Sequence, residues 1–572
     1  MRPGTVGTAA STAMVGQNCR AGSRRRRAGT LVASCIVVAG GLVGSFVGTT
    51  AEAGARTYGS GGTAGSVLLV GTFDGHAGPY TTIQSAVDAA KPGDWILIAP
   101  GDYHENADES GIHTDPSDGY MGGVMIDTPD IHLRGMSRSG VIVDGTKAGS
   151  PACSSDPADQ NFGAAGPNGQ AVGRNGILVW KADDVSVENL TACNFLAGTG
   201  DSGNEIWWNG GADSGKIGLK GYSGSYLTAT STFFSTVGTA DQQEQSAAQY
   251  GIFSSNSAGP GTWDQLYASN FNDSGMYVGA CHQLCGITID HAWMEFNALG
   301  YSGTNSGGAV VVENSKFDNN QDGFDTNTQI NGDPPAPQNG DCPRHGISPI
   351  TRTHSCWVFM HNVVVDNNNP DVPEEGNAAA GPVGTGMTLS GGRNDTVMDN
   401  TFSDNGAWGF LMVPYPDSGT PSLHQSCPAT GGVETAGFGC VYDPEHDALL
   451  DNTFSHDGYF GNPSNADFGQ ITLDGNQPQN CFAGNVDPDG SAPTDLEQID
   501  PTCGKTAKAA NTGGALLGQV LCDTGFGSCP SGSTYPVRTG VVMHPLPTDL
   551  KGMPNPCQGV PANAWCPHGK PA

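Results

Sequence analysis

The chain has 572 residues, of which 86 are Gly and only 14% are charged, and its formal net charge is −32. Gly, Asn, Asp and Ser tolerate the backbone angles of sharp corners, so this composition favours short strands joined by tight turns over a helical bundle. The negative charge disfavours nucleic acid and anionic membranes as partners, because either one would add electrostatic repulsion.

The N-terminus carries the three parts of an export signal. These are a basic segment (residues 24–27), an apolar run (31–47) and a small-residue cleavage site (51–53). We therefore predict a signal peptide over residues 1–53, a linker over 54–66 and a secreted, extracellular protein that has no membrane partner after cleavage. The alternative is an uncleaved membrane anchor, because the apolar run nearly reaches the ~20 residues that span a bilayer.

A helical pattern directly precedes a strand pattern in residues 80–105. Ile83, Ala86, Val87 and Ala90 have the spacing of one helix face, and the Pro-Gly-Asp sequence that follows ends the helix. A strand then begins at Trp95. In a strand-rich chain, this order predicts a short amphipathic helix that caps the first coil of a repeating structure.

A polar phrase recurs between about residues 124 and 485, followed each time by a β-branched or aromatic pair. Clear instances are 188–191 (ENLT), 313–317 (ENSKF), 399–406 (DNTFSDNG) and 451–458 (DNTFSHDG). Alternating segments such as 308–313 (GAVVVE) predict half-buried strands. An Asn at the same place in each unit can hydrogen-bond the Asn of the next unit, which is typical of a parallel β-helix.

Two segments carry a family resemblance. Residues 82–87 (TIQSAV) and 91–103 (KPGDWILIAPGDY) resemble the first coil of the pectate-lyase-like, right-handed parallel β-helix superfamily, pectin esterases included. The resemblance implies an all-β, right-handed parallel β-helix with a short N-terminal capping helix, which we place over residues 67–490. It implies no single activity, because this superfamily holds lyases, hydrolases, esterases, epimerases and non-catalytic adhesins. Residues 491–572 are expected to form a cap or tail rich in Cys, Pro and Gly.

Fourteen cysteines lie outside the predicted signal peptide, an even number that fits disulfides formed in an oxidising compartment. Their spacing predicts local pairs and leaves Cys153 with Cys193. The predicted pairs are Cys281/Cys285, Cys342/Cys356, Cys427/Cys440, Cys481/Cys503, Cys522/Cys529 and Cys557/Cys566.

The densest acidic group is residues 318–325 (DNNQDGFD). Asp322 and Asp325 are three residues apart across a glycine, so whether they share a face depends on the turn. Paired carboxylates suit acid/base cleavage of a glycosidic bond or Ca²⁺ binding, which makes Ca²⁺ a conceivable cofactor and leaves the metal ligands unassigned. Ordinary turn aspartates are the alternative interpretation.

Part of this group is similar to polygalacturonases. Residues 320–325 resemble the segment that carries one catalytic aspartate, with Gln321 where that family favours Thr, and residues 344–348 (RHGIS) resemble its histidine motif. The resemblance implies catalytic roles for Asp322, Asp325 and His345. The chain departs from the family because no Asp-Asp pair lies between the two segments and no Arg-x-Lys motif follows.

Two further groups are candidates. Arg393 is one of only six arginines between residues 124 and 485 and is a candidate for the basic residue of an elimination reaction, with carboxylate anchoring in the scaffold as the alternative. Residues 442–447 (YDPEHD) slightly resemble the Asp-Pro-His-Glu motif of alginate epimerases, in a different order. A plain loop next to Cys440 is the alternative.

The adjacent Trp207 and Trp208 are candidate sugar-binding residues. Neighbours in a strand point to opposite faces, so both rings cannot point inward, and we expect one of them to be exposed or in a loop. From these features we predict a secreted β-helix protein that binds or cleaves an extracellular polysaccharide as a lyase or glycoside hydrolase. The alternatives are a non-enzymatic surface scaffold and a Ca²⁺-dependent uronate epimerase.

Overall fold

The computed structural model describes most of one compact unit, Gly59–Ala572. The residues outside the description are 1–64, 107–121, 164, 166–168, 199–201, 212–218, 280, 282–283, 305, 328–338, 344–345, 377, 417–426, 428–430, 436–438, 473–479, 504–513 and 570–572. The predicted signal peptide, nearly all of the predicted linker and the candidate His345 thus lie outside the described residues.

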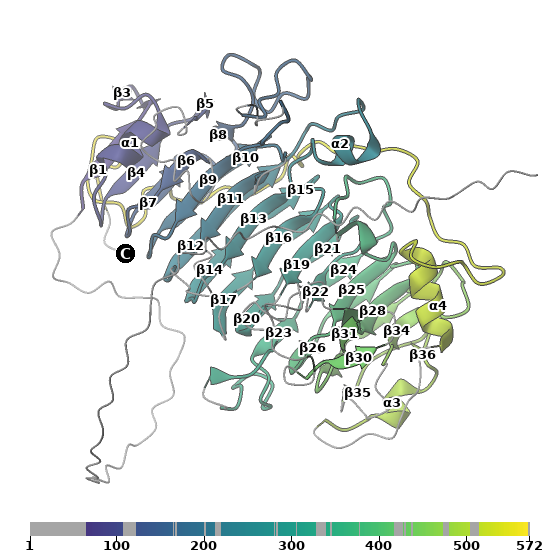
Figure 1. The fold of residues 1–572 in the computed structure, drawn as a ribbon. Coiled ribbons are helices and arrows are strands. Elements are labelled where there is room, and N and C mark those ends of the chain that lie inside the picture. The colour runs from purple at the N-terminus through teal and green to yellow at the C-terminus, as the bar shows by residue number, and fades with distance from the viewer. Residues whose placement is uncertain are drawn as a thin grey trace, which may run out of the picture. The chain divides into compact units, whose positions relative to one another are not determined.

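Three stacks of parallel strands form successive coils (Figure 1). The first stack contains β1 (Val67–Val70), β4 (Trp95–Ile98), β7 (His132–Gly135), β10 (Ser186–Cys193), β12 (Tyr222–Thr230), β14 (Gly261–Asp264), β17 (Leu284–Asp290), β20 (Gly308–Glu313), β23 (Trp357–Met360), β26 (Asp395–Met398), β32 (Ala448–Leu450) and β35 (Cys481–Ala483). The second contains β5 (Gly101–Tyr103), β8 (Val141–Asp144), β15 (Tyr267–Ser269), β18 (Trp293–Glu295), β21 (Lys316–Asp318), β24 (Val363–Val365), β27 (Thr401–Ser403) and β33 (Thr453–Ser455). Because β10 and β12 continue through the corner, the two stacks form one 20-stranded sheet.

The third stack is a separate sheet of eleven strands. Its members are β6 (Gly122–Ile126), β9 (Asn175–Trp180), β11 (Asn204–Asn209), β13 (Tyr250–Ser255), β16 (Ser274–Gly279), β19 (Leu299–Thr304), β22 (Asp325–Asn327), β25 (Thr385–Ser390), β28 (Trp408–Val413), β34 (Ala466–Gln470) and β36 (Ser491–Ala492). Inward side chains of all three stacks form one continuous core, which confirms the predicted right-handed parallel β-helix.

Polar ladders close the corners between the stacks. Asn362, Asn400, Asn452 and Asn485 follow the first stack, and each donates its side-chain amide to the next at 2.9–3.1 Å. A second ladder stands before the eleven-stranded sheet, and its bonds are 2.9–3.1 Å long. Its members are Asn297, Asn320, Asn367, Asn405 and Asp457. The predicted asparagine ladder is therefore present, because a bend leaves backbone groups that these amides satisfy.

The early repeats use their Asn differently from this prediction. Asn189 and Asn314 have φ angles of 57° and 50°, so they occupy the left-handed corner position that Asp399 and Asp451 fill in later coils. In the coils of Asn314, Asp399 and Asp451, the ladder position is the residue that follows. Asn can adopt the left-handed conformation and can also form the hydrogen bonds of a ladder. The recurring sequence pattern alone therefore did not distinguish a corner residue from a ladder residue.

The N-terminal helix α1 (Ile83–Ala89) caps the first coil as predicted. Ile83, Ala86 and Val87 are buried in the core, and the Thr82 side chain caps the helix by accepting from the Ser85 N–H. The Glu105 carboxylate accepts from the N–H groups of Ile83 (2.6 Å) and Gln84 (3.1 Å), which satisfies two free donors of the first turn. The short hairpin β2 (Thr72–Phe73) and β3 (His76–Ala77) lies beside it.

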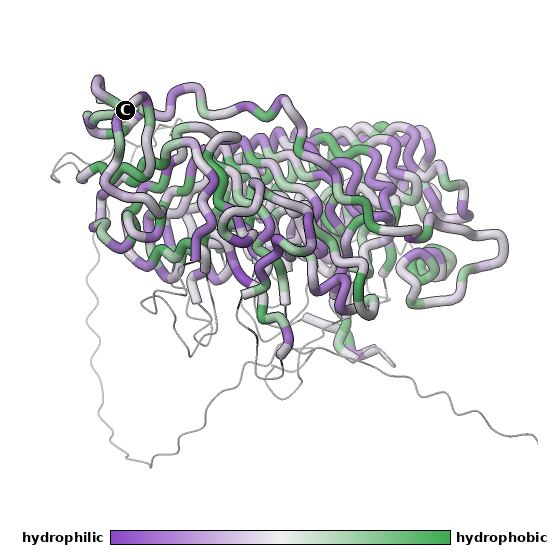
Figure 2. The backbone as a smooth tube through the Cα atoms, turned by 90° about the horizontal axis from the view of Figure 1, so that it is seen from above, coloured by the Kyte–Doolittle hydropathy of each residue, from purple (hydrophilic) through white to green (hydrophobic). Residues whose placement is uncertain are grey.

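After α3 (Leu496–Ile499) and α4 (Gly514–Asp523), the C-terminal segment runs back along the coils to their N-terminal end (Figures 1 and 2). Three contacts trace its path. Asn270 and His544 exchange side-chain to backbone bonds, Arg138 donates to the Lys551 carbonyl, and the Trp565 indole donates to the His76 carbonyl. Among the described residues, no helix is both long and apolar enough to cross a membrane.

Seven disulfides join the chain locally. They link Cys153–Cys193, Cys281–Cys285, Cys342–Cys356, Cys427–Cys440, Cys481–Cys503, Cys522–Cys529 and Cys557–Cys566. These are the pairs that the spacing predicts. So many disulfides fit a protein of an oxidising, extracellular compartment.

Candidate functional site

Asp322 and Asp325 both point outward from the eleven-stranded sheet. Between them, Phe324 is buried in the core and Gly323 lies against the Asn367 ladder side chain, so the two intervening residues face inward. The Thr388 hydroxyl donates to Asp322 Oδ2 at 2.7 Å. The turn therefore places both carboxyl groups on one face of the sheet. The sequence alone had left open whether they share a face.

Asp325 lies at the surface of this face and is half-buried. The Ser390 hydroxyl donates to its Oδ1 at 2.9 Å, and the Asn327 amide donates to its Oδ2 at 2.8 Å. Burial raises the pKa of Asp325 to about 6, although these two hydrogen bonds favour the ionised form. The group therefore changes protonation just below neutral pH.

Asp322 is fully buried beneath α4 and the segment before β25. Burial, and then the charge of Asp325, raise its pKa well above the usual value. Asp523, the last residue of α4, adds another carboxyl group, and its pKa is raised by burial and by Asp322. Asp322 is therefore an interior carboxyl group whose protonated form is favoured by burial, and it is not accessible from the surface.

Asp273 is the residue that sequence reasoning missed. It immediately precedes β16, and the Tyr250 hydroxyl donates to its Oδ2 at 3.0 Å. Burial raises its pKa to about 7, and the nearby carboxylates of Glu375 and Asp325 raise it further. In sequence, Asp273 lies in an Asn/Asp-rich corner segment like those of many structural residues. Only the residues around it in the folded chain distinguish it from them.

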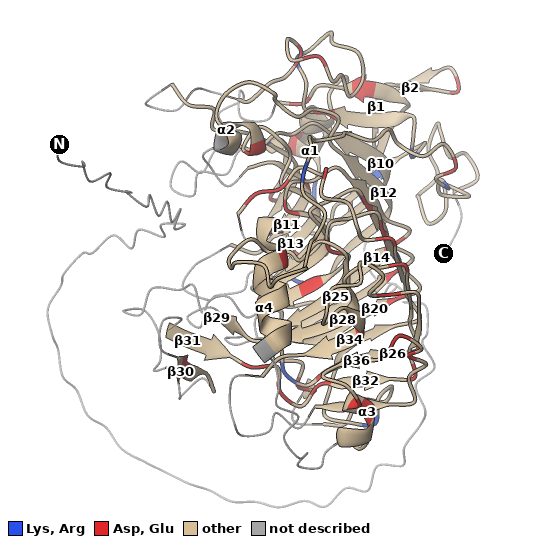
Figure 3. Cartoon of the chain, turned by 90° about the vertical axis from the view of Figure 1, so that its right-hand side faces the viewer, with Lys and Arg blue, Asp and Glu red and all other residues tan. Residues whose placement is uncertain are grey.

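Tyr415 stands beside both acids. It belongs to β29 (Tyr415–Pro416), which pairs with β31 (Gly439–Tyr442) and, through it, β30 (Val433–Thr435) in a small antiparallel sheet next to the solenoid (Figure 3). Burial raises its pKa, and the negative charges of Asp325 and then Asp273 raise it further. One phenol thus lies within electrostatic reach of two carboxyl groups from different coils.

Aromatic side chains continue this face toward the N-terminus. Trp207, Phe253 and Tyr277 occupy equivalent positions on β11, β13 and β16, and the register continues through Ser302 to Asp325. The rings are stacked, with centroids 5.0 Å apart for the first pair and 4.5 Å for the second. The aromatic row therefore leads to the coil that carries the outward carboxylate.

The structure corrects the prediction for the Trp pair. Trp207 and Trp208 do point to opposite faces, but neither is exposed or in a loop, because both lie in β11 and Trp207 is only 4% exposed. Trp208 is in the core, where it packs against Tyr222 and Trp263, and cannot bind a sugar. Trp207 is covered because it stacks against Phe253.

Arg393 anchors a neighbouring loop. Its guanidinium donates to the Gly431 carbonyl at 2.7 Å, lies 5.8 Å from the Tyr442 ring centroid, and approaches Glu445 at 3.8 Å. These contacts favour the scaffold role over a role in elimination. Within residues 442–447, Tyr442 and Asp447 are fully buried, and Tyr442 pairs with Tyr415 of β29.

Oxygen donors of the kind that Ca²⁺ prefers are present in Asp273, Asp325 and Glu375. However, these residues do not form one of the close His, Cys, Asp or Glu groupings found among the described residues, in which ligand atoms lie within 4.8 Å of one another. Those groupings lie on the other sheet. Within the described part of the chain, the carboxyl groups on this face therefore form no close grouping of ligand atoms.

No protein-family model and no curated protein matches the sequence. Among solved structures, the chain is similar to the A-module of mannuronan C-5 epimerase AlgE4 from Azotobacter vinelandii (12% identity, 71% of this chain and 90% of that one, TM-score 0.36). It is also similar to a mannuronic acid specific family 6 lyase from human gut microbiota (11%, 73% and 80%, 0.38) and to pectate lyase Pel9A (12%, 83% and 90%, 0.33). At these values the similarities carry no argument about chemistry.

Proposed function

We propose that the protein is a secreted glycoside hydrolase that cleaves a neutral extracellular polysaccharide on the outer face of the eleven-stranded sheet. Asp273 is the general acid and Asp325 its carboxylate partner. The observation that carries this proposal is the pair of half-buried carboxyl groups beside Tyr415, with pKa values raised to about 7 and about 6. Two carboxyl groups whose environments set different pKa values are the pattern of an acid and a base.

The two raised pKa values support this division of roles. At a pH between about 6 and about 7, Asp273 retains its proton while Asp325 is ionised. Asp273 donates its proton to the glycosidic oxygen as the bond from that oxygen to the anomeric carbon breaks, and Asp325 removes a proton from the water that attacks the same carbon. The coil of β19 separates the two acids, which leaves room for that water and favours inversion at the anomeric centre.

The surroundings favour a neutral substrate. The carboxylates of Asp325 and Glu375 make the face negative, which would repel a polyuronate. Two arginines of neighbouring segments are already engaged by glutamates, Arg393 by Glu445 and Arg538 by Glu244 and Glu374. Tyr277, half-buried at the end of the aromatic row, is placed to pack against the C–H face of a sugar ring.

The test is release of reducing ends from a panel of neutral and uronic polysaccharides, with and without Ca²⁺. We expect hydrolysis of a neutral member, and a loss of kcat on the order of 10²–10⁴-fold in both Asp273→Asn and Asp325→Asn. Asp399→Asn is the matched control, since Asp399 is exposed at a corner of the other sheet and should keep full activity. Proton NMR of the first product should show inverted anomeric configuration.

Other outcomes would identify the alternatives. An unsaturated product absorbing in the ultraviolet would replace hydrolysis by elimination, and Ca²⁺-dependent change of uronate composition without cleavage would indicate an epimerase. Neither binding nor turnover of any member would leave the presenting scaffold as the better description.

A further inference from the structure

A second cluster of side chains lies on the 20-stranded sheet, away from the proposed hydrolase residues. Asp102 and His104 flank Tyr103 on β5, and Asp144 ends the neighbouring strand β8, where Tyr103 pairs with Val143. Since Val143 is in the core, the three residues on alternate positions face outward together. One ligand atom of each lies within 4.8 Å of the other two.

The histidine ring is oriented by a residue outside the cluster. Its Nδ1 lies 3.1 Å from the carbonyl oxygen of Thr146, and a carbonyl can only accept, so Nδ1 carries the proton. In the neutral ring, Nε2 then presents its lone pair toward Asp102 Oδ2, 3.3 Å away. A proton on Nε2 or on the carboxyl group, or a bound cation, can occupy the space between these two atoms.

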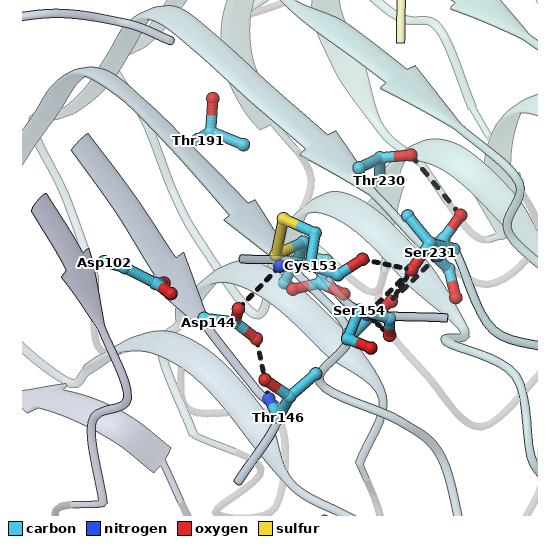
Figure 4. The surroundings of a disulfide bond; sticks show 12 residues. Asp102, Asp144, Thr146, Cys153, Ser154, Thr191, Thr230 and Ser231 are labelled. Atoms are coloured by element: carbon cyan, nitrogen blue, oxygen red, sulfur yellow. Dashed lines mark hydrogen bonds between the residues drawn. A yellow bond between two sulfur atoms is a disulfide. The ribbon is translucent and has the colours of Figure 1, made fainter. Parts of the chain in front are cut away.

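Asp144 is held just as firmly. It is fully buried, its Oδ1 accepts from the Thr146 N–H at 2.7 Å, and its Oδ2 accepts from the Cys153 N–H at 2.6 Å. Figure 4 shows Asp102 and Asp144 next to the Cys153–Cys193 disulfide, which fixes the second donor.

We propose that Asp102, His104 and Asp144 bind a divalent transition-metal ion, with Zn²⁺ as the first choice, that fastens the segment after β8 to the first coils. One imidazole and two carboxylates are the donor set of such ions, whereas Ca²⁺ prefers oxygen alone. An imidazole whose other nitrogen donates to a backbone carbonyl, and a carboxylate that backbone N–H groups hold, are the usual outer-shell features of metal ligands. The disulfide sulfurs nearby are oxidised and are not thiolate ligands.

The chain supplies a matched control cluster. Asp264, Asp290 and His291 contain the same residue types at similar spacing. However, the His291 side chain is 51% exposed, against 13% for His104, and its Nδ1 contacts Asp290 at 2.8 Å instead of a backbone carbonyl. This second cluster has the features of an ordinary surface ion pair.

The experiment is metal titration of the full mature chain after chelator treatment and dialysis. Zn²⁺, Mn²⁺ and Ca²⁺ are added separately in calorimetry and thermal unfolding, and Co²⁺ is added for visible absorption. We expect one Zn²⁺ per chain, a saturable rise in Tm and Co²⁺ d–d bands. His104→Gln and Asp102→Asn should each weaken Zn²⁺ binding tenfold or more and abolish the bands, while His291→Gln should bind as the wild type does.

Several results would overturn the proposal. These are equal Zn²⁺ affinity in the wild type and His104→Gln, an equal loss in His291→Gln, no binding of Zn²⁺ or Mn²⁺, and binding of Ca²⁺ alone. Asp102 is partly exposed, so Asp102→Asn provides a folded test if the histidine variant does not fold. Polysaccharide hydrolysis does not enter these readouts, so the two proposals fail separately.

Discussion

Two sets of buried or half-buried polar groups differ in how completely they are satisfied. In the corner ladder, Asn297, Asn320, Asn367 and Asn405 each donate to the next side chain, and every member after Asn297 also accepts from the previous one. On the outer face of the eleven-stranded sheet, Asp273 and Asp325 are not repeated, and their charges raise the pKa values of their neighbours. A repeated row of fully hydrogen-bonded side chains stabilises the coils. Acids that are not repeated, and that disfavour one another's ionisation, are instead typical of a functional site.

The strongest test of this contrast is the pH dependence of the proposed hydrolysis. Activity needs Asp325 ionised and Asp273 protonated, so kcat/KM should be greatest between pH 6 and 7, where the two raised pKa values lie. Beyond each limit it should fall about tenfold per pH unit, roughly a hundredfold two units away. A pH–rate profile that is flat between pH 5 and 8 would show that these two acids do not carry the reaction.

The ladder should respond in stability and not in activity. Asn405→Ala removes the acceptor of the Asn367 amide and the donors to the Val364 carbonyl and Asp457 Oδ1. Leaving these buried groups unpaired should lower the free energy of unfolding by about 2 kcal/mol in urea titration. The corner variant Asn314→Gly, which keeps a left-handed conformation at an exposed site, should change it little. A loss of kcat in correctly folded Asn405→Ala would contradict the hypothesis that the ladder stabilises the fold without contributing to activity.

The contrast also explains how far the sequence could be interpreted. The fold was predictable because each coil repeats the same local signals, from the TIQSAV helix to the corner asparagines that the ladder uses. Asp322 and Asp325 stood out as a dense pair, but the fully buried Asp322 and the surface Asp325 could not be separated without the coils around them. Asp273 depends on Tyr250, Glu375 and Tyr415 for its character, and those residues are distant in sequence.

The end of the ladder allows the finest test. Asp457 takes the place of the next Asn and accepts from Asn405 through Oδ1, while its Oδ2 has no hydrogen-bond partner among the described residues. Burial and Asp467 raise its pKa to about 7 from an ordinary value of 3.8. The folded chain therefore holds a proton that the unfolded chain loses, and wild-type stability falls as pH rises from about 4 to about 7 and then levels off.

Asp457→Asn should remove that part of the pH dependence and extend the ladder. Its new amide can donate to Asp467 Oδ1, which has no partner within the described part of the chain. Relative to the wild type, the variant should gain about 2–3 kcal/mol in unfolding free energy between pH 5 and pH 8, because the raised pKa lies about two units above pH 5 and each unit corresponds to about 1.4 kcal/mol. Urea titrations at the two pH values measure this, with Asp399→Asn as the exposed control. Parallel pH curves for wild type and Asp457→Asn would mean that the last carboxyl group of the ladder is already ionised, and that the ladder carries a buried charge after all.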